Sequence, residues 1–284
     1  MILLTGATGQ AGSNVAKELS KTGTRFRVMV RDPAKAGALR QSNIEIVQGD
    51  FTDPKSMEAA MKGIERLMLI SPPGPDLPRM EAQAVAVAKR AGVRHVVNFS
   101  SAGADANAPA RFGKGHRQSE KNVEASGLAW THLRPTFFMH NLLGLAGMVK
   151  SGTIYFDAGD GKAPFVDLAD VGAVAAKVLT GSGHESKVYE LTGPAALGYA
   201  DIAAIFTRLL GREVTYVNIT HEAMKQNLVK AGLGEWQAGG IVELSQAMSS
   251  GAMARVTDTV QKIAGRSPKP VEQFLRANLA TFGE

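Results

Sequence analysis

The chain has 284 residues, of which 44% are hydrophobic, 20% are charged and none is cysteine, and its formal net charge is +6. The absence of cysteine excludes disulfides, thiolate nucleophiles and thiolate-bound metals. Because the basic residues are dispersed and only 6% of the chain is aromatic, we expect no nucleic-acid partner, and a negatively charged small molecule is the better ligand.

The length favours one large domain, or one domain with a smaller lobe. No apolar run approaches the ~20 residues that a membrane-spanning helix needs. Because the apolar start at 1–4 runs straight into a glycine-rich segment, we expect no export signal. We therefore expect a cytoplasmic protein with no membrane segment, and a homo-oligomer is compatible with the sequence.

Residues 1–150 alternate short β-branched runs with helical patterns, in which apolar residues recur three and four positions apart. Strict alternation of this kind gives right-handed crossovers and a parallel sheet with helices on both faces. The predicted fold is a doubly wound α/β (Rossmann) fold. Strands are predicted at 1–5, 25–30, 44–48, 66–70, 95–100 and 129–134, and helices at 12–22, 33–41, 53–61, 78–92 and 115–126.

From residue 151 onward the pattern changes. Helices are predicted at 166–179 and 199–211, short strands at 187–193 and 212–219, and an almost wholly helical chain from His221. We therefore expect a first domain over 1–150 and a smaller, mostly α-helical lobe over 151–284, with some elements of the second part returning to the sheet.

Between the first strand and the first helix stands TGATGQAGS, in which three glycines are spaced three residues apart. A tight turn suits Gly6, close approach of a pyrophosphate excludes a side chain at Gly9, and Gly12 lets the helix pack closely on the strand. The N–H groups at the start of the helix then bind phosphates. The alternative is a glycine-rich turn without a ligand. A dinucleotide is the expected ligand, in contact with Gly6, Thr8, Gly9, Gln10, Ala11 and Gly12.

The residues after the second strand predict which dinucleotide binds. An NAD site usually has an acidic residue there, which binds the ribose hydroxyls. Here the sequence reads FRVMVRD, and Arg31 suits a bidentate contact to the 2′-phosphate that NADP carries and NAD lacks. Asp32 is either a ribose ligand or a cap for the next helix. We expect NADP(H) as the cofactor, and NAD(H) stays open.

Two further segments follow strands at the same edge of the sheet. In GDFTD, after the third strand, Asp50 is placed to accept from the adenine amino group and Phe51 to lie against the ring, unless Asp50 only stabilises the turn. In ISPPG, after the fourth strand, Ser71 and Pro72 are expected to line the cofactor path, unless the prolines only end the strand.

The Tyr-x-x-x-Lys pair of ordinary short-chain dehydrogenases is absent, because none of the four tyrosines is followed by lysine four positions later. The helix after the fifth strand instead has His116 and Glu120 on one face, followed by Glu124. His116 either donates a proton or a hydrogen bond to a substrate, or forms a surface ion pair with Glu120. No third ligand for a metal is visible beside this pair, and we expect no metal.

These motifs resemble the NmrA-like family of atypical short-chain dehydrogenases/reductases, and the resemblance covers essentially the whole chain. It is carried by TGATGQAG, Arg31, GDFTD, SGLAWTHLRPTFFMHN and FVDLADVGAVAAKVL. The His-x-x-x-Glu spacing is similar to the subgroup of type 2 NAD(P)H:quinone oxidoreductases, triphenylmethane dye reductases and related azoreductases. Isoflavone-reductase-like members carry a lysine where Glu120 stands, so their lysine mechanism is not expected here.

The resemblance also implies roles for the segment LRPTFFMHN after the sixth strand. Thr136 and Phe137 are expected near the nicotinamide. Phe138, Met139 and Asn141 are expected at the border of the substrate pocket, where aromatic and thioether side chains suit a flat apolar acceptor. The alternative is that the two phenylalanines belong to the core.

Together these features predict an NADPH-dependent reductase of a small aromatic acceptor. A quinone, an azo compound or a triarylmethyl cation is already electron-poor, so its reduction by hydride depends less on a positioned acid than reduction of a simple ketone does. Trp236 is a candidate for closing over the pocket. The main alternative is an NADP-binding redox sensor that acts through a protein partner without catalysis, and a third reading is reduction of a carbon–nitrogen double bond.

Overall fold

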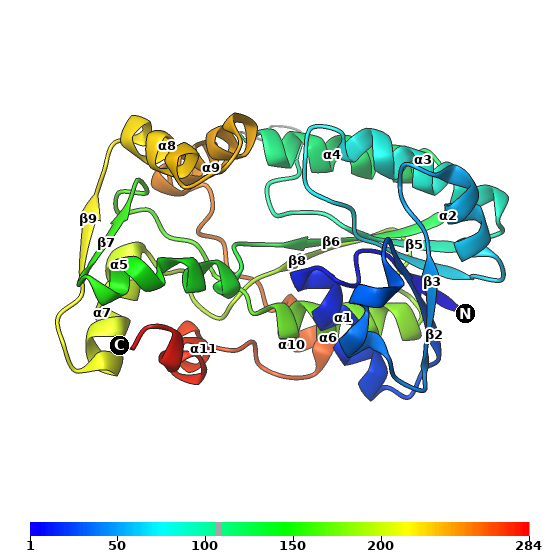
Figure 1. Ribbon diagram of the computed structural model, residues 1–284, viewed down its shortest axis with the longest axis horizontal. Coiled ribbons are helices and arrows are strands. Elements are labelled where there is room, and N and C mark those ends of the chain that lie inside the picture. Colours follow the sequence, from blue (N-terminus) through cyan, green and yellow to red (C-terminus); the bar gives the residue numbers. More distant parts are fainter. Residues whose placement is uncertain (106–109, 284) are drawn as a thin grey trace.

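Seven parallel strands form the central sheet of the computed structural model, which describes residues 1–105 and 110–283 (Figure 1). Their order is β3-β2-β1-β4-β5-β6-β8, so the chain moves outward from β1 to β3 and then returns to place β4 on the other side of β1. The predicted doubly wound fold is confirmed. The strands are β1 (Ile2–Leu4), β2 (Phe26–Val30), β3 (Ile44–Gln48), β4 (Arg66–Leu69), β5 (His95–Phe99), β6 (Ala129–Pro135) and β8 (Lys187–Leu191).

Helices cover both faces of this sheet (Figure 1). Apolar side chains of each helical layer pack against the strands, which gives one hydrophobic cluster on each face. The helices at 10–21 and 168–180 approach each other especially closely because Gly172 has no side chain: a Cβ there would lie 2.7 Å from the carbonyl oxygen of Asn14. One face carries α1 (Gln10–Lys21), α6 (Leu168–Thr180) and α10 (Thr259–Ala264), and the other α2 (Pro54–Met61), α3 (Leu77–Arg90) and α4 (Arg111–Glu124).

Side-chain caps explain where two of these helices begin. The Asp53 carboxylate accepts a hydrogen bond from the backbone N–H of Lys55, and Pro54 takes the first helical position. Asp167 caps α6 in the same way through the N–H of Ala169. Each cap fixes the path of the loop that leads into its helix.

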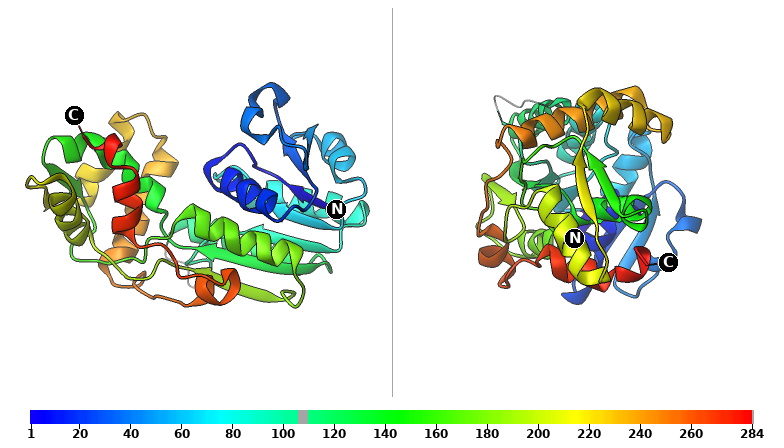
Figure 2. Two further views of the ribbon diagram at one scale, coloured as in Figure 1. Left: turned by 90° about the horizontal axis from the view of Figure 1, so that it is seen from below. Right: turned by 90° about the vertical axis from the view of Figure 1, so that its left-hand side faces the viewer.

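A second hydrophobic core holds the C-terminal lobe beside the sheet (Figure 2). Its first buried residue is Met139, so the packing of this lobe begins before residue 150. Strands β7 and β9 pair in parallel into a small separate sheet, whereas α6, β8 and α10 belong to the layers of the main sheet. The other elements of this part are η3 (Met139–Leu145), α5 (Ala146–Lys150), β7 (Thr153–Phe156), α7 (Tyr199–Leu210), β9 (Thr215–Asn218), α8 (His221–Lys230), α9 (Glu235–Ser249), α11 (Val271–Ala277) and η4 (Leu279–Thr281).

The helix predicted at 33–41 is wrong. The segment forms two single turns of 3₁₀-helix, η1 (Pro33–Lys35) and η2 (Gly37–Leu39). Of its nine residues only Ala36 and Leu39 are buried, and so small an apolar contact does not offset the cost of nucleating an α-helix.

Two other elements differ from the prediction. Helix α4 begins at Arg111, four residues before the predicted start, although Gly113 and Gly115 lower its intrinsic helix propensity. Contacts of its first turn with α9 stabilise this start, since the backbone N–H of Arg111 donates to the Glu243 carboxylate at 2.7 Å. Strand β7 has no counterpart in the prediction. Within the described residues, no helix has both the length and the apolar character needed to cross a membrane.

Candidate functional site

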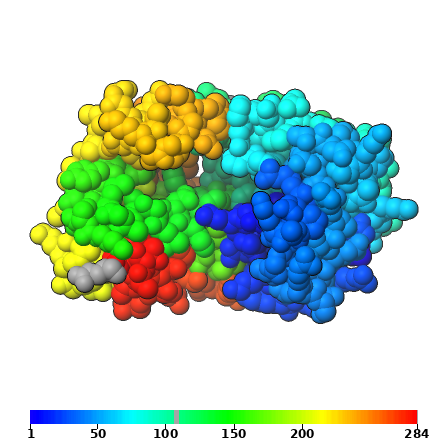
Figure 3. Space-filling model, in the orientation of Figure 1, coloured from blue at the N-terminus to red at the C-terminus, as the bar shows by residue number. Residues whose placement is uncertain are grey.

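A cleft of about 780 Å³ opens at the carboxyl edge of the sheet, between the sheet and the C-terminal lobe. Its walls come from the loops after β1 to β6, from side chains of α3 and α4 and, on the side of the lobe, from Leu244 of α9 and from Met253. Figure 3 shows the recess between the N-terminal part of the chain and the lobe. The cleft includes the place between β1 and β4 where the strand order reverses, which is where doubly wound sheets bind ligands.

The glycines after β1 make a turn that other residues would disrupt. Gly6 has a left-handed φ of +65°, and a Cβ there would lie 2.8 Å from the carbonyl oxygen of Ile70. A Cβ on Gly12 would collide with the carbonyl oxygen of Gly6, so this glycine lets the start of α1 pack on its own turn. At Gly9 a Cβ would meet only the Gly6 oxygen, at 3.3 Å, and otherwise open space. Packing therefore explains two glycines, and Gly9 leaves room on the cleft side.

The start of α1 presents backbone donors to this cleft. Gly9 is the N-cap and has no side chain to cap the helix. The first N–H of the helix with an acceptor in the described chain is that of Ser13, which donates to the Gly9 carbonyl at 2.9 Å. The N–H groups of Gln10, Ala11 and Gly12 have no such acceptor, and all three residues line the cleft, as does Thr8. This arrangement suits an anion such as a phosphate.

The two charged residues after β2 differ in role. Arg31 is exposed and lines the cleft. Asp32 does not line it: its Oδ1 accepts from the backbone N–H of Ala34 at 3.0 Å, and its other oxygen lies 3.9 Å from the Lys35 ammonium. The reading of Asp32 as a cap is confirmed, and Arg31 is the charge available to a ligand at this point.

Asp50 lies on the cleft wall and also stabilises its own turn. Its Oδ1 accepts from the backbone N–H and from the hydroxyl of Thr52, at 2.8 and 2.7 Å. These two hydrogen bonds, with the nearby charge of Arg31, lower the pKa of Asp50, so the carboxylate remains ionised at neutral pH.

Every predicted cofactor-binding residue lines the cleft, and so do His116, Phe138 and Asn141. Phe137 and Phe138 line the cleft and also pack against core aromatic rings, with centroid distances of 5.9 Å from Phe137 to Phe165 and 6.3 Å from Phe138 to Phe99. The residues of the predicted cofactor set that are not described above are Phe51, Ser71, Pro72, Thr136 and Phe137.

The expectation that Met139 borders the pocket is wrong. Its side chain is fully buried in the second core and does not line the cleft. Residues 137–139 run beside Val166: the Val166 N–H donates to the Phe137 carbonyl and the Met139 N–H to the Val166 carbonyl. In such an extended pairing successive side chains point to opposite sides, so Phe138 lines the cleft and Met139 points into the core.

His116 is partly buried on the cleft wall, and its Nδ1 has no hydrogen-bond partner among the described residues. Burial lowers its pKa to about 4, even though Glu120 acts in the opposite direction, so the imidazole is neutral at neutral pH. The alternative of a surface ion pair with Glu120 is wrong, because the Glu120 side chain is fully buried.

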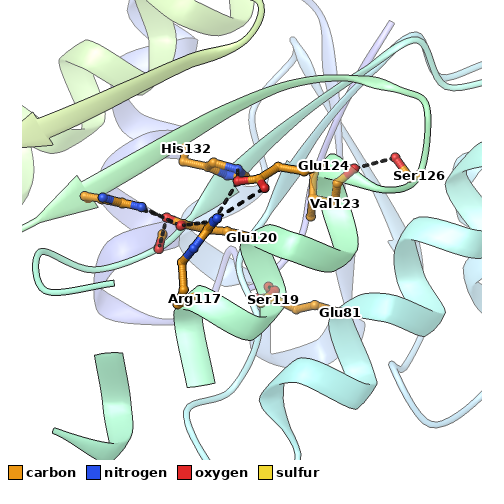
Figure 4. A network of polar contacts seen from close by, with 10 residues as sticks. Glu81, Arg117, Ser119, Glu120, Val123, Glu124, Ser126 and His132 are labelled. Carbon is orange, nitrogen blue, oxygen red and sulfur yellow. Dashed lines mark hydrogen bonds and ion pairs between the residues drawn. The ribbon is translucent and has the colours of Figure 1, made fainter. Parts of the chain in front are cut away.

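Glu120 instead belongs to a buried network under the cleft wall (Figure 4). Arg134 binds it through two nitrogens, at 2.7 and 2.6 Å, and Arg117 adds a contact at 3.0 Å. The hydroxyl of Ser100, which lines the cleft, donates to its Oε1 at 2.7 Å. These hydrogen bonds outweigh the effect of burial and lower the pKa of Glu120, so it is a carboxylate.

Glu120, Glu124 and His132 lie close enough together to suggest a metal site. Arg117 bridges the two carboxylates, with its Nη1 2.7 Å from Glu124, and Arg134 also binds Glu120. The guanidinium groups therefore already compensate the charge that a cation would need, and this set is better described as a structural ion-pair network.

The sequence analysis missed the residues that close the far side of the cleft. Phe112 lines it from the first turn of α4, and Leu244 and Met253 line it from the lobe. Trp236 does not line the cleft but packs edge-on against Phe112, with a centroid distance of 5.0 Å. No local pattern predicts these residues, because they meet only after the lobe has packed on α4.

Comparisons with known proteins agree with this architecture. The NAD(P)H azoreductase of Xenophilus azovorans is 37% identical over 284 residues, which cover 100% of this chain and 99% of that protein. The structure of the NADPH-dependent quinone oxidoreductase of Escherichia coli in complex with NADPH has a TM-score of 0.92 at 32% identity, and covers 98% of this chain and 100% of that one.

The triphenylmethane reductase of a Citrobacter species, in complex with NADP(H), has a TM-score of 0.90 at 29% identity, with 98% and 99% of the two chains covered. The profile of the NmrA-like family matches residues 1–275. The chain belongs to the NmrA-like family.

Proposed function

We propose that this protein is an NADPH-dependent reductase that transfers a hydride to an electron-poor acceptor such as a quinone, an azo compound or a triarylmethane dye. The observation that carries the proposal is a single cleft that joins an anion-binding turn and Arg31 to a wall of aromatic side chains. One end suits a dinucleotide phosphate and the other a flat apolar molecule.

The residues at the sheet edge fit the cofactor. The free N–H groups at the start of α1 and the open space beside Gly9 accommodate a pyrophosphate, and Arg31 suits the 2′-phosphate. Asp32 is engaged as a cap, so no carboxylate directly after β2 is available to bind the ribose hydroxyls as in an NAD site. When bound, NADPH supplies the hydride. Two of the relatives named above have been solved with NADPH or NADP(H), which supports the same choice here.

The acceptor class follows from what lines the cleft. Neither tyrosine nor lysine stands among its lining residues in the described part of the chain, so the usual acid pair for ketone reduction is missing. Phe112, Phe138 and Met253 offer apolar surface to a planar ring. The relatives named as a quinone oxidoreductase, an azoreductase and a triphenylmethane reductase support this acceptor class.

The test is oxidation of NADPH, followed optically, against a benzoquinone, menadione, an azo dye and crystal violet, with NADH in parallel. The Arg31→Ala variant should weaken NADPH binding about 10- to 100-fold, because a charged hydrogen bond contributes about 1.5–3 kcal/mol, and should leave NADH little changed. Arg90→Ala is the control, since it removes the same charge from an exposed position outside the cleft.

Turnover that falls with NADPH only in the Arg31 variant supports both the reaction and the 2′-phosphate contact. Tight NADPH binding without reduction of any acceptor would contradict the reductase proposal and would favour a redox sensor that acts through a protein partner.

A further inference from the structure

Two glutamates lie buried behind the same wall of the cleft. Glu81 of α3 and Glu120 of α4 are both fully buried. Each accepts a hydrogen bond from the hydroxyl of a serine that lines the cleft: Ser71 donates to Glu81 at 2.7 Å, and Ser100 donates to Glu120 at 2.7 Å. Each carboxyl group is thus one hydroxyl away from a bound ligand.

The surroundings of the two glutamates differ in charge. Glu120 is held by Arg134 and Arg117, as described above, and is ionised. The hydrogen-bond partners of Glu81 in the described chain are the hydroxyls of Ser71 and of the buried Ser119, and it has no ion-pair partner there. Figure 4 shows Glu81 beside Ser119. A buried carboxyl group without a cation holds its proton more tightly than one in water.

Burial is the largest effect on Glu81 and raises its pKa to about 7, although the two serine hydroxyls act in the opposite direction. The charged group that faces it from α4 is Glu120, whose negative charge adds to this rise. Two neighbouring carboxyl groups whose pKa values are pushed apart in this way are a recurrent arrangement for an acid and a fixed anion.

His116 does not provide an alternative acid at this wall. It lines the cleft, but its pKa of about 4 leaves it without a spare proton at neutral pH. Glu81 therefore differs from both neighbours: it carries an exchangeable proton near neutral pH and has a hydroxyl between itself and the cleft.

We propose that Glu81, through the hydroxyl of Ser71, delivers the proton that completes reduction of the acceptor; this inference rests on the function proposed above. The acceptor gains two electrons and one hydrogen as hydride from NADPH, which leaves an anion on a quinone oxygen or an azo nitrogen. For the transfer, the Ser71 hydroxyl hydrogen turns toward that anion, and the protonated Oε1 of Glu81 donates to Ser71 Oγ across the same 2.7 Å contact. The Glu81 O–H bond breaks as its proton moves to Ser71 Oγ, and the Ser71 O–H bond breaks as its proton moves to the anion. Water in the cleft returns a proton to the Glu81 carboxylate by the same hydroxyl after the product leaves.

This relay predicts that acceptors differ in their dependence on Glu81. A quinone or an azo compound needs the proton. A triarylmethyl cation becomes neutral on accepting hydride alone, so its reduction needs no proton. A purely structural role for Glu81 would affect both kinds of acceptor alike.

The first test does not use turnover. Infrared spectra of the whole protein labelled with ¹³C-glutamate, recorded at about pH 6, should show the C=O stretch of a protonated carboxylic acid, because the pKa of Glu81 is about 7. The band should be absent in Glu81→Gln and present in the control Glu18→Gln, which alters a buried glutamate of α1 that pairs with Lys21. Absence of the band from the wild-type protein would overturn the proposal whether or not any acceptor is reduced.

The second test compares acceptors. In Glu81→Gln and Ser71→Ala, kcat for menadione should fall about 100-fold, the usual contribution of a positioned acid. In Glu81→Gln, whose side chain does not line the cleft, kcat for crystal violet should stay within experimental error of the wild type. Wild-type menadione reduction should be slower in D₂O and should decline as pH rises through about 7, and both effects should vanish in Glu81→Gln.

Equal losses for the two acceptors, or no loss for either, would overturn the relay while leaving the reductase function in place. If wild-type protein reduces no acceptor, the proposed function fails, and the infrared band then decides whether Glu81 still holds its proton.

Discussion

The two ends of the cleft are built in different ways. The cofactor end is made of short segments that each follow a strand of the sheet. Backbone groups form much of its surface for the ligand, namely the turn at Gly6 and the N–H groups at the start of α1 that have no acceptor in the described chain. The acceptor end is made of side chains that meet from α4, the segment after β6, α9 and the loop that contains Met253.

This difference separates what the fold dictates from what it leaves free. A doubly wound sheet brings its strand ends to one edge whatever the rest of the chain does, so the cofactor end is a property of the topology. The acceptor end depends on how one lobe packs on one helix. We therefore expect substitutions in the glycine turn of the cofactor end to act through backbone geometry, and those at the acceptor end to change one substrate constant at a time.

The largest effect is expected for Gly12→Ala. Its Cβ would collide with the carbonyl oxygen of Gly6, and backbone cannot yield as a flexible side chain does. Strain of about 3 kcal/mol should lower NADPH affinity about 100-fold. Fluorescence titration with NADPH, with circular dichroism as a check on folding, measures the change. Gly147→Ala, where an added Cβ meets open space, should behave as the wild type; equal effects of the two substitutions would contradict this account of the turn.

The second effect concerns Glu81, which lies behind Ser71, on the wall that the two ends share. Since its pKa is raised from 4.5 to about 7, the folded protein holds a proton between those pH values that the unfolded chain has released. The contribution of Glu81 to the free energy of unfolding, measured as the difference between the wild-type protein and Glu81→Gln, should therefore fall as pH rises from about 4.5 to 7 and level off above, by on the order of 2–3 kcal/mol. Urea unfolding at intervals between pH 5 and pH 8 tests it, and parallel curves for the two proteins would contradict the raised pKa.

A smaller effect is expected at the acceptor end. Phe112 lines the cleft and packs against Trp236 and Gly240. The contact with the glycine is close, since a Cβ added to Gly240 would lie 2.5 Å from the Phe112 ring. Phe112→Ala should raise KM for menadione about 10-fold through lost aromatic contact, with the affinity for NADPH unchanged. Steady-state kinetics with each substrate varied in turn separates the two. Phe156→Ala, which alters a phenylalanine outside the cleft, is the control. An equal rise of KM for menadione in this variant would contradict a specific role for Phe112 and would mean that the packing of the whole lobe is affected.

The smallest effect is expected for Asp32, next to the cofactor end. Asp32→Ala removes the cap on η1 and should cost at most about 1 kcal/mol of stability. The preference for NADPH over NADH should not change, because Asp32 stands outside the cleft. Competition binding of the two cofactors measures this. A shift of the variant toward NADPH would mean that Asp32 takes part in cofactor selection after all.

Local patterns predicted the cofactor end well. Hydrophobic periodicity gave the strands, and strand order then brings Gly6, Arg31 and Asp50 to one edge without knowledge of any side-chain contact. The same patterns failed where tertiary packing decides. The segment after Asp32 has the composition of a helix but little to pack against, and α4 extends through two glycines because α9 stabilises its first turn.

The acceptor end and the buried network were less accessible from sequence. Met139 has the right side-chain type for a pocket, but pairing with Val166 turns it into the core. One signal for Glu81 was present: it occupies a position in the apolar stripe of α3, where Leu77, Ala84 and Val85 are also buried. A carboxyl group on such a stripe predicts a buried acid. The sequence did not predict its hydrogen-bond partners, because Ser71 and Ser119 come from other segments of the chain.

The most direct test of the central claim is a single turnover of the wild-type protein. Protein saturated with NADPH is mixed anaerobically with menadione, and loss of the reduced nicotinamide absorbance is followed by stopped flow. We predict stoichiometric oxidation of the bound NADPH, much faster than that of free NADPH under the same conditions. Bound NADPH that persists at the uncatalysed rate, with menadione and the other acceptors alike, would contradict the account.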